Sequence, residues 1–119
     1  KKNTKVFIDS CKEILALNKN GLELDFEIGS LVYSLILRIR GLLMIKLMLN
    51  NKLYSKQELL YYLEKNNMAK NKIEELYIIY SQERNNMRIK ENSIIVKNDI
   101  KRLLTIAEKL FDEVKNLLK

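Results

Sequence analysis

Residues 31–49 constrain the fold of this chain more than any other segment. The run from Leu31 to Leu49 is apolar on nearly every face of a helix, whereas a surface helix carries a single apolar stripe. It approaches the length that spans a bilayer, but Arg38, Arg40 and Lys46 lie within it. Each of these charges costs about 2.5 to 3.5 kcal/mol at the centre of a membrane, which outweighs the gain from the leucines. We therefore expect residues 25–49 to form the central core helix of a soluble protein.

The rest of the chain also has helical periodicity, and no segment shows the sustained alternation typical of a strand. Asn20-Gly21 is expected to end the first helix, because glycine readily adopts the left-handed conformation of a helix cap. Ser55-Lys-Gln-Glu58 is a capping-box pattern, which marks a helix start. Residues 94–96 fit either an extended piece or a first helical turn. The expected helices cover about residues 4–18, 25–49, 55–66, 70–87 and 97–118.

These elements predict an all-α fold, an up-and-down helical bundle of four longer helices plus one short helix, because short loops favour antiparallel neighbours. A length of 119 residues fits a single domain over 1–119. The first residue is Lys1 rather than Met, so we expect either that a few residues are missing or processed or that the chain is a piece of a longer protein, such as a C-terminal domain. No apolar leader is present, and a single cysteine fits a reducing cytoplasm.

The composition excludes several kinds of chemistry. The chain has no His, so imidazole general bases, Ser-His or Cys-His dyads and His-containing zinc sites are ruled out. Its one cysteine, Cys11, cannot form an intrachain disulfide and supplies only one thiolate to a metal. Cys11 lies in a helical apolar stripe, which predicts an unreactive core thiol. We expect no metal and no cofactor.

The charge is strongly basic, with 22 Lys and Arg against 15 Asp and Glu and a net charge of +7. Lysines spread over helix surfaces predict mainly a solvated face, while a phosphate-binding surface stays open as the alternative. The aromatic residues lie mostly at core spacing and predict no stacking platform. Arg38 and Arg40 point roughly 200° apart on one helix. At least one of them should therefore face packed protein. Its partner is expected to be either an acidic residue of the 73–91 segment (Glu74, Glu75 or Glu83), in an ion pair, or the phosphate of a ligand.

Three stretches together resemble the HEPN superfamily of helical domains. They are Ser34-Leu-Ile-Leu-Arg-Ile-Arg-Gly-Leu-Leu-Met-Ile45, Tyr54-Ser-Lys-Gln-Glu-Leu-Leu60 and Glu75-Leu-Tyr-Ile-Ile-Tyr-Ser-Gln-Glu-Arg-Asn-Asn86, continued by Ala107-Glu-Lys-Leu110 in the last helix. The likeness is greatest to HEPN domains attached to, or encoded beside, archaeal minimal nucleotidyltransferases, and it covers about residues 22–119. It implies a helical bundle that is often a homodimer.

Active members of this superfamily cleave RNA without metal, using an Arg followed four to six residues later by a His. The matching residues here are Arg84 and the polar Asn85, but positions 89–91 hold Ile, Lys and Glu instead of His. The tyrosine that some members carry shortly after the His also has no counterpart. Loss of a general acid–base typically costs about 10²–10⁴-fold in rate. The resemblance therefore implies a degenerate, non-catalytic member.

The leading hypothesis is a non-catalytic nucleotide- or RNA-binding or regulatory module that partners a minimal nucleotidyltransferase, as in toxin–antitoxin-like pairs. Its expected partners are a second copy of the chain, the nucleotidyltransferase, and nucleotide or RNA phosphates, with no membrane. One alternative is a residual metal-independent ribonuclease that uses Arg84 with Lys90 or Glu91. Another is a structural domain for protein–protein interaction. The candidate phosphate-binding residues are Arg84, Asn85, Arg88, Arg38 and Arg40.

Overall fold

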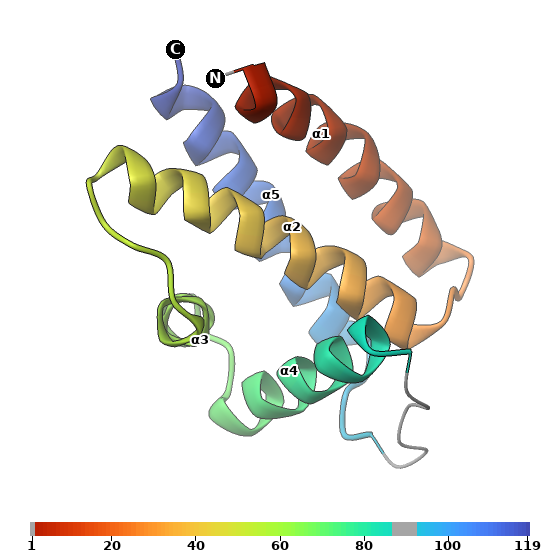
Figure 1. Cartoon of the computed structure of the whole chain (residues 1–119). Helices are drawn as coiled ribbons and strands as arrows, with labels where there is room; N and C mark the ends of the chain where they lie inside the picture. Colours follow the sequence, from red (N-terminus) through yellow and green to blue (C-terminus); the bar gives the residue numbers. More distant parts are fainter. Residues whose placement is uncertain (1, 87–92) are drawn as a thin grey trace.

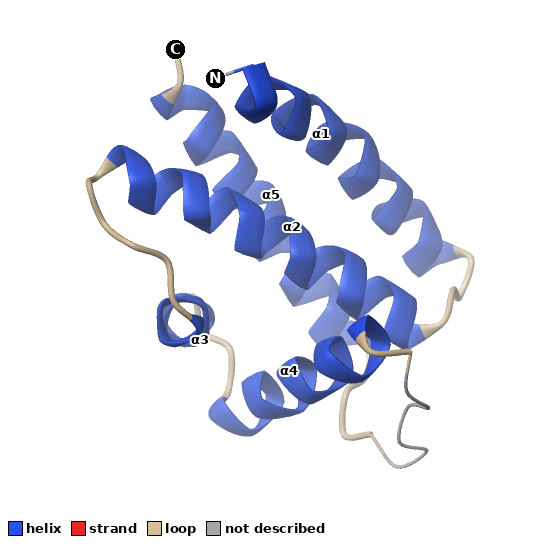
Figure 2. Ribbon diagram, in the orientation of Figure 1, coloured by secondary structure: helices blue, strands red, loops and turns tan. Residues whose placement is uncertain are grey.

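The computed structural model describes residues 2–86 and 93–119, and within these ranges every regular element is a helix (Figures 1 and 2). The prediction of an all-α bundle is confirmed. The five helices are α1 (Lys2–Glu23), α2 (Ile28–Leu49), α3 (Lys56–Lys65), α4 (Lys70–Arg84) and α5 (Lys97–Leu117).

The apolar helix α2 lies at the centre of the fold and packs against all four other helices. Its side chains Leu35, Ile36, Ile39 and Leu42 are completely buried. Among the described helices, α2 is the one long and apolar enough to cross a membrane, but half of its most apolar window is covered by protein. Contacts with the four other helices account for the apolar side chains on its covered faces, as expected for a core helix.

Contacts between the long helices define their directions. The ring of Phe7 in α1 lies against Gly41 of α2, and the Ser34 hydroxyl donates to the Asn18 side chain at 3.2 Å, so α1 and α2 are antiparallel. The ion pair between Lys46 of α2 and Glu113 of α5 joins the C-terminal parts of two parallel helices. Figure 1 shows α4 crossing near the N-terminal end of α2, with α3 seen end-on beside the loop that follows α2.

The expected end of the first helix is wrong. Helix α1 continues through Asn20 and Gly21 to Glu23, and Asp25, with a φ of 55°, makes the left-handed turn instead. Gly21 is needed for space, because a Cβ atom there would lie 2.8 Å from the Phe26 ring. The second helix accordingly begins at Ile28 rather than at Asp25.

Three Asn-Asn pairs end the next three helices in the same way. The first asparagine of each pair is the C-cap and the second has a φ of 55° to 70°. Asparagine tolerates this left-handed conformation better than other residues with a side chain. The fourth helix therefore ends at Arg84, three residues before the expected end at Met87. The pairs are Asn50-Asn51, Asn66-Asn67 and Asn85-Asn86.

The helix starts follow their sequence signals more closely. The Ser55 hydroxyl accepts from the Glu58 N–H at 3.2 Å, which confirms the cap predicted for α3. Residues 94–96 are not helical, Val96 has an extended backbone, and α5 begins at Lys97. The Asp99 carboxylate accepts from the Val96 N–H at 2.8 Å and so satisfies a backbone donor just before the first turn of α5.

Lys72 of α4 holds this helix start in place. Its ammonium group donates to the Ile94 carbonyl at 2.7 Å and to the Asp99 carboxylate at 2.8 Å. Partial burial raises the pKa of Asp99, but the hydrogen bonds from Lys72 and from the Val96 N–H outweigh it, so the pKa is lowered overall. The charged form of Asp99 therefore stabilises the folded state.

We expect Asp99→Asn to lower the free energy of unfolding at pH 7 by about 1 kcal/mol, as for the loss of a charged helix cap. Because the folded pKa is below the unfolded value of about 3.9, the stabilisation is present above that value and is lost as the pH falls through the folded pKa. The difference between wild type and variant in urea unfolding should therefore shrink below about pH 4. Asp112→Asn, an exposed change on the same helix, is the control. A difference that stays constant from neutral to strongly acidic pH contradicts this role.

Candidate functional site

The predicted site residues Arg84 and Asn85 lie at the C-terminal end of α4. Arg84 is the last helical residue and Asn85 is the C-cap, and both are exposed. A cation in the last turn interacts favourably with the partial negative charge of a helix C-terminus, so Arg84 also has a structural role. Arg88 lies outside the described residues, as do positions 89–91, where the family's His is expected.

Arg38 and Arg40 point to different sides of α2, as their spacing predicts. The guanidinium of Arg40 lies over the ring of Tyr54, 5.4 Å from its centroid. Arg38 lies close enough to Cys11 of α1 to lower the pKa of that thiol electrostatically. The Nε atom of Arg38 is buried and has no hydrogen-bond partner. The structure therefore separates these two candidates, and only Arg40 reaches the side of α2 on which α3 and α4 pack.

Four tyrosines, Tyr33, Tyr54, Tyr77 and Tyr80, form a cluster where α2, α4 and the loop before α3 meet. Tyr33 and Tyr80 are stacked, with ring centroids 5.5 Å apart and an angle of 18° between the planes. Tyr77 lies beside Tyr80 at 5.6 Å with a tilted ring. The four tyrosines pack in or against the core, in line with the core spacing predicted for the aromatic residues, and they also contact one another. The half-buried members are Tyr33, Tyr54 and Tyr77, whereas Tyr80 is buried.

Two cations flank the tyrosine cluster, and no carboxylate pairs with either of them in the described part of the chain. Lys56 lies over the ring of Tyr77, 4.4 Å from its centroid, and Arg40 lies over Tyr54. The expected ion pair of Arg38 or Arg40 with an acidic residue of α4 is not formed among the described residues. The ion pairs there are Lys46–Glu113, Lys72–Asp99 and Lys97–Asp25.

The phenol group of Tyr54 stays protonated at neutral pH. Burial raises the pKa of Tyr54, and the neighbouring Arg40 partly opposes this shift through its charge and a hydrogen bond. A neutral phenol donates and accepts hydrogen bonds, while the cations beside it supply positive charge. The arrangement suits an anionic ligand with a planar group. It contains no imidazole, the usual side chain for proton transfer near neutral pH, so it is poorly suited to general acid–base chemistry.

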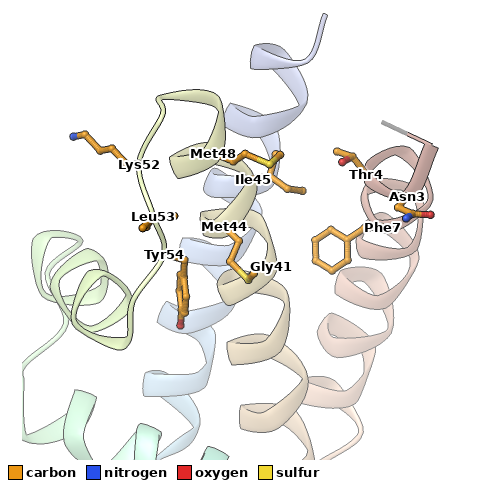
Figure 3. A pocket seen from close by; sticks show the side chains of 10 residues that line it. All are labelled: Asn3, Thr4, Phe7, Gly41, Met44, Ile45, Met48, Lys52, Leu53 and Tyr54. Carbon is orange, nitrogen blue, oxygen red and sulfur yellow. The ribbon is translucent and has the colours of Figure 1, made fainter.

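A hollow of about 450 Å³ opens over the C-terminal half of α2, next to the tyrosine cluster (Figure 3). Gly41, Met44 and Met48 of α2 form its floor, and Phe7 of α1 and Leu53 stand on opposite sides. The exposed fractions are 41% for Met44, 60% for Met48 and 91% for Leu53, which are high values for apolar side chains. The full lining is Asn3, Thr4, Phe7, Gly41, Met44, Ile45, Met48, Lys52, Leu53 and Tyr54.

The described residues hold no group of three or more His, Cys, Asp or Glu that could bind a metal ion. Comparisons of the chain with protein-family models, with curated proteins and with solved structures find no match. The likeness to HEPN domains therefore depends on the residues quoted above and stays a prediction.

Sequence reasoning did not find either the tyrosine cluster or the hollow. The spacing of Tyr77 and Tyr80 places them on one helical face, but Tyr33 and Tyr54 reach them only through the packing of α2 and α4. The all-round apolar pattern of residues 31–49 predicts that Met44 and Met48 belong to a helix buried on several sides, whereas both are exposed. The signal that could have indicated the hollow is the exposed Leu53, an isolated apolar residue in the turn that follows Asn50-Asn51.

Cys11 is an unreactive core thiol in this structure. Its side chain is completely buried, and burial raises its pKa to about 11, although the charge of Arg38 acts in the opposite direction. The thiolate is the form that attacks thiol reagents, and almost none of it is present at pH 8.

We expect a disulfide reagent at pH 8 to label the native protein at least about 100-fold more slowly than the urea-unfolded chain, because the pKa alone lowers the thiolate fraction by that factor. Absorbance of the released leaving group measures the rate. In a matched control, Cys11→Ala combined with Lys12→Cys places the thiol at an exposed neighbouring position, where labelling should be rapid. Equal rates for native and unfolded wild type would contradict the core assignment.

Proposed function

We propose that this chain is a non-catalytic binding module of the HEPN type, which contacts a nucleotide or RNA and acts beside a minimal nucleotidyltransferase. The observation that carries the proposal is the pair of cations, Arg40 and Lys56, on a cluster of tyrosines without a carboxylate partner. A guanidinium is well suited to a phosphate, since its planar fork can donate two parallel hydrogen bonds. Bases of a nucleotide or a single strand stack on tyrosine rings.

The charge of the chain supports the same proposal. A net charge of +7 attracts polyanions and speeds their association. Arg84 and Asn85 are exposed at the end of α4, one turn beyond Tyr80 of the tyrosine cluster. A strand of RNA that stacks on the cluster could therefore also reach Arg84. Arg38 is not part of this proposed site, because it lies on the side of α2 that faces α1.

The finer parts of the proposal come from the family resemblance. They are an HEPN-like up-and-down bundle of four longer helices and one short helix, a homodimer, and a cytoplasmic location. The absence of His from the chain supports a non-catalytic role within a superfamily that otherwise uses His to cleave RNA. A short nucleotidyltransferase encoded next to this chain, or fused to it, would support the pairing directly.

We expect Arg40→Gln to weaken the binding of fluorescently labelled single-stranded RNA by about tenfold or more, the loss typical of a charge-assisted hydrogen-bond pair. Fluorescence anisotropy over a salt series measures the affinity, which should fall as salt rises.

The matched control for this measurement is Arg38→Gln. It removes the same charge from the same helix but points to α1, so it should change the affinity by less than about twofold. An affinity that is absent at low salt, independent of salt, or equally sensitive to both variants contradicts the proposed site.

We expect no cleavage of RNA by the purified protein in the presence of EDTA, because no imidazole is available for proton transfer. Gel electrophoresis of end-labelled RNA measures this. Turnover that resists EDTA and disappears in Arg84→Ala would favour the residual ribonuclease instead.

A protein–protein interaction domain is the second candidate function, and the hollow over α2 specifically favours it. Exposed apolar side chains gathered in a concave surface are typical of binding sites for partner chains.

A further inference from the structure

The hollow over α2 has the shape of a groove that runs along the helix. Its floor residues Gly41, Met44, Ile45 and Met48 follow the spacing i, i+3, i+4, i+7, so the floor extends about 10 Å along the axis of α2. Phe7 stands on one side of this floor and Leu53 with Tyr54 on the other (Figure 3). The groove therefore occupies the place where a further helix would lie in a bundle.

A second hollow, of about 460 Å³, adjoins the groove at the same end of the bundle. The two share Thr4, Ile45 and Met48 in their linings, so they form one continuous surface. The second hollow adds apolar side chains from α1, α2 and the end of α5, namely Ile8, Leu49 and Leu118. Met48 lies between the two hollows, and its long, flexible side chain can repack to fit a ligand.

The charged side chains that line the two hollows are all lysines. Lys52 lines the first hollow, Lys5 and Lys115 line the second, and none of the described residues that line either hollow is acidic. All three lysines are exposed. Glu113 of α5 is paired with Lys46 of α2. A ligand that fills the groove therefore meets apolar side chains in the middle and, at the edges, lysine ammonium groups with no carboxylate beside them in the lining.

We infer that the groove binds an amphipathic helix of a partner protein, with its apolar stripe on Met44, Met48 and Leu53 and its flanking carboxylates beside Lys5, Lys52 and Lys115. A helix fits better than an extended peptide, because the backbone groups of the floor are already bonded within α2 and offer no edge to a strand. The lysines select acidic flanks over basic ones. The groove adjoins the proposed nucleotide site at Tyr54, but the residues used in this inference are not part of that site.

A designed peptide tests the inference on the full chain. The probe is a labelled amphipathic helix of about 16 residues, with leucines at i, i+3, i+4, i+7 spacing and glutamates on the other faces. We expect saturable binding by fluorescence anisotropy that weakens as salt rises, and at least tenfold weaker binding of the same peptide with lysines in place of glutamates. Equal affinity for both peptides, or no saturable binding of the acidic one, overturns the inference.

Two pairs of variants locate the site on the protein. The double variant Met48→Gln/Leu53→Ser changes two exposed side chains of the groove and should weaken peptide binding about tenfold. Its control, Leu17→Ser, changes an exposed apolar side chain elsewhere on α1 and should change the affinity by less than about twofold. Lys52→Gln should weaken binding and flatten the salt dependence, whereas Lys101→Gln, an exposed lysine of α5, should not. The inference is overturned if, in either pair, the control variant weakens peptide binding more than the groove variant does.

Other occupants of the groove give distinct outcomes. Sedimentation velocity shows whether Met48→Gln with Leu53→Ser disrupts self-association, and flotation with phosphatidylglycerol vesicles detects a lipid surface. Either result in the absence of peptide binding overturns the inference in favour of a second copy or an anionic membrane.

Discussion

The burial of α2 determines how the rest of this fold is arranged. A helix with apolar side chains on nearly every face cannot lie on a surface, so other helices must cover it from several directions. α1 and α5 cover its length, and the stacked rings of Tyr33 and Tyr80 join its N-terminal half to α4. The cover is incomplete over the C-terminal half, where Met44 and Met48 line the groove. The same helix therefore provides both the core and the exposed apolar surface.

The two arginines of α2 show how position on one helix decides chemical role. Arg38 and Arg40 are two residues apart, yet one lies beside the Cys11 thiol and the other over a tyrosine ring. Neither forms an ion pair in the described part of the chain. The half-buried Arg40 lies at the edge of the tyrosine cluster, where it contacts Tyr54 through its charge and a hydrogen bond. The two arginines have nearly the same sequence context, but their surroundings differ. Arg40 is therefore a better candidate for contacting a ligand than Arg38.

The helices could be predicted from the sequence because local interactions specify them. Apolar periodicity marks their buried faces, Ser55 begins α3, and Asn50-Asn51 and Asn66-Asn67 end α2 and α3. The same signal at Asn85-Asn86 ends α4 earlier than predicted. The candidate sites could not be predicted in the same way, since they depend on packing between helices. The tyrosine cluster needs α4 to cross α2, and the groove needs the chain after Asn51 to stand away from Phe7. The helix end predicted at Asn20-Gly21 is wrong for a related reason. Gly21 provides space for the ring of Phe26 and does not form a turn.

The helical conformation of Asn20 and Gly21 also affects the chemical lifetime of the protein. In a flexible chain, an Asn-Gly bond deamidates readily, because the backbone nitrogen of the glycine attacks the asparagine side chain to form a cyclic imide. That attack requires a backbone geometry that an α-helix does not adopt. Since both residues lie within α1, the native fold protects this bond, and conversion of Asn20 to aspartate or isoaspartate would record the time that α1 has spent unfolded.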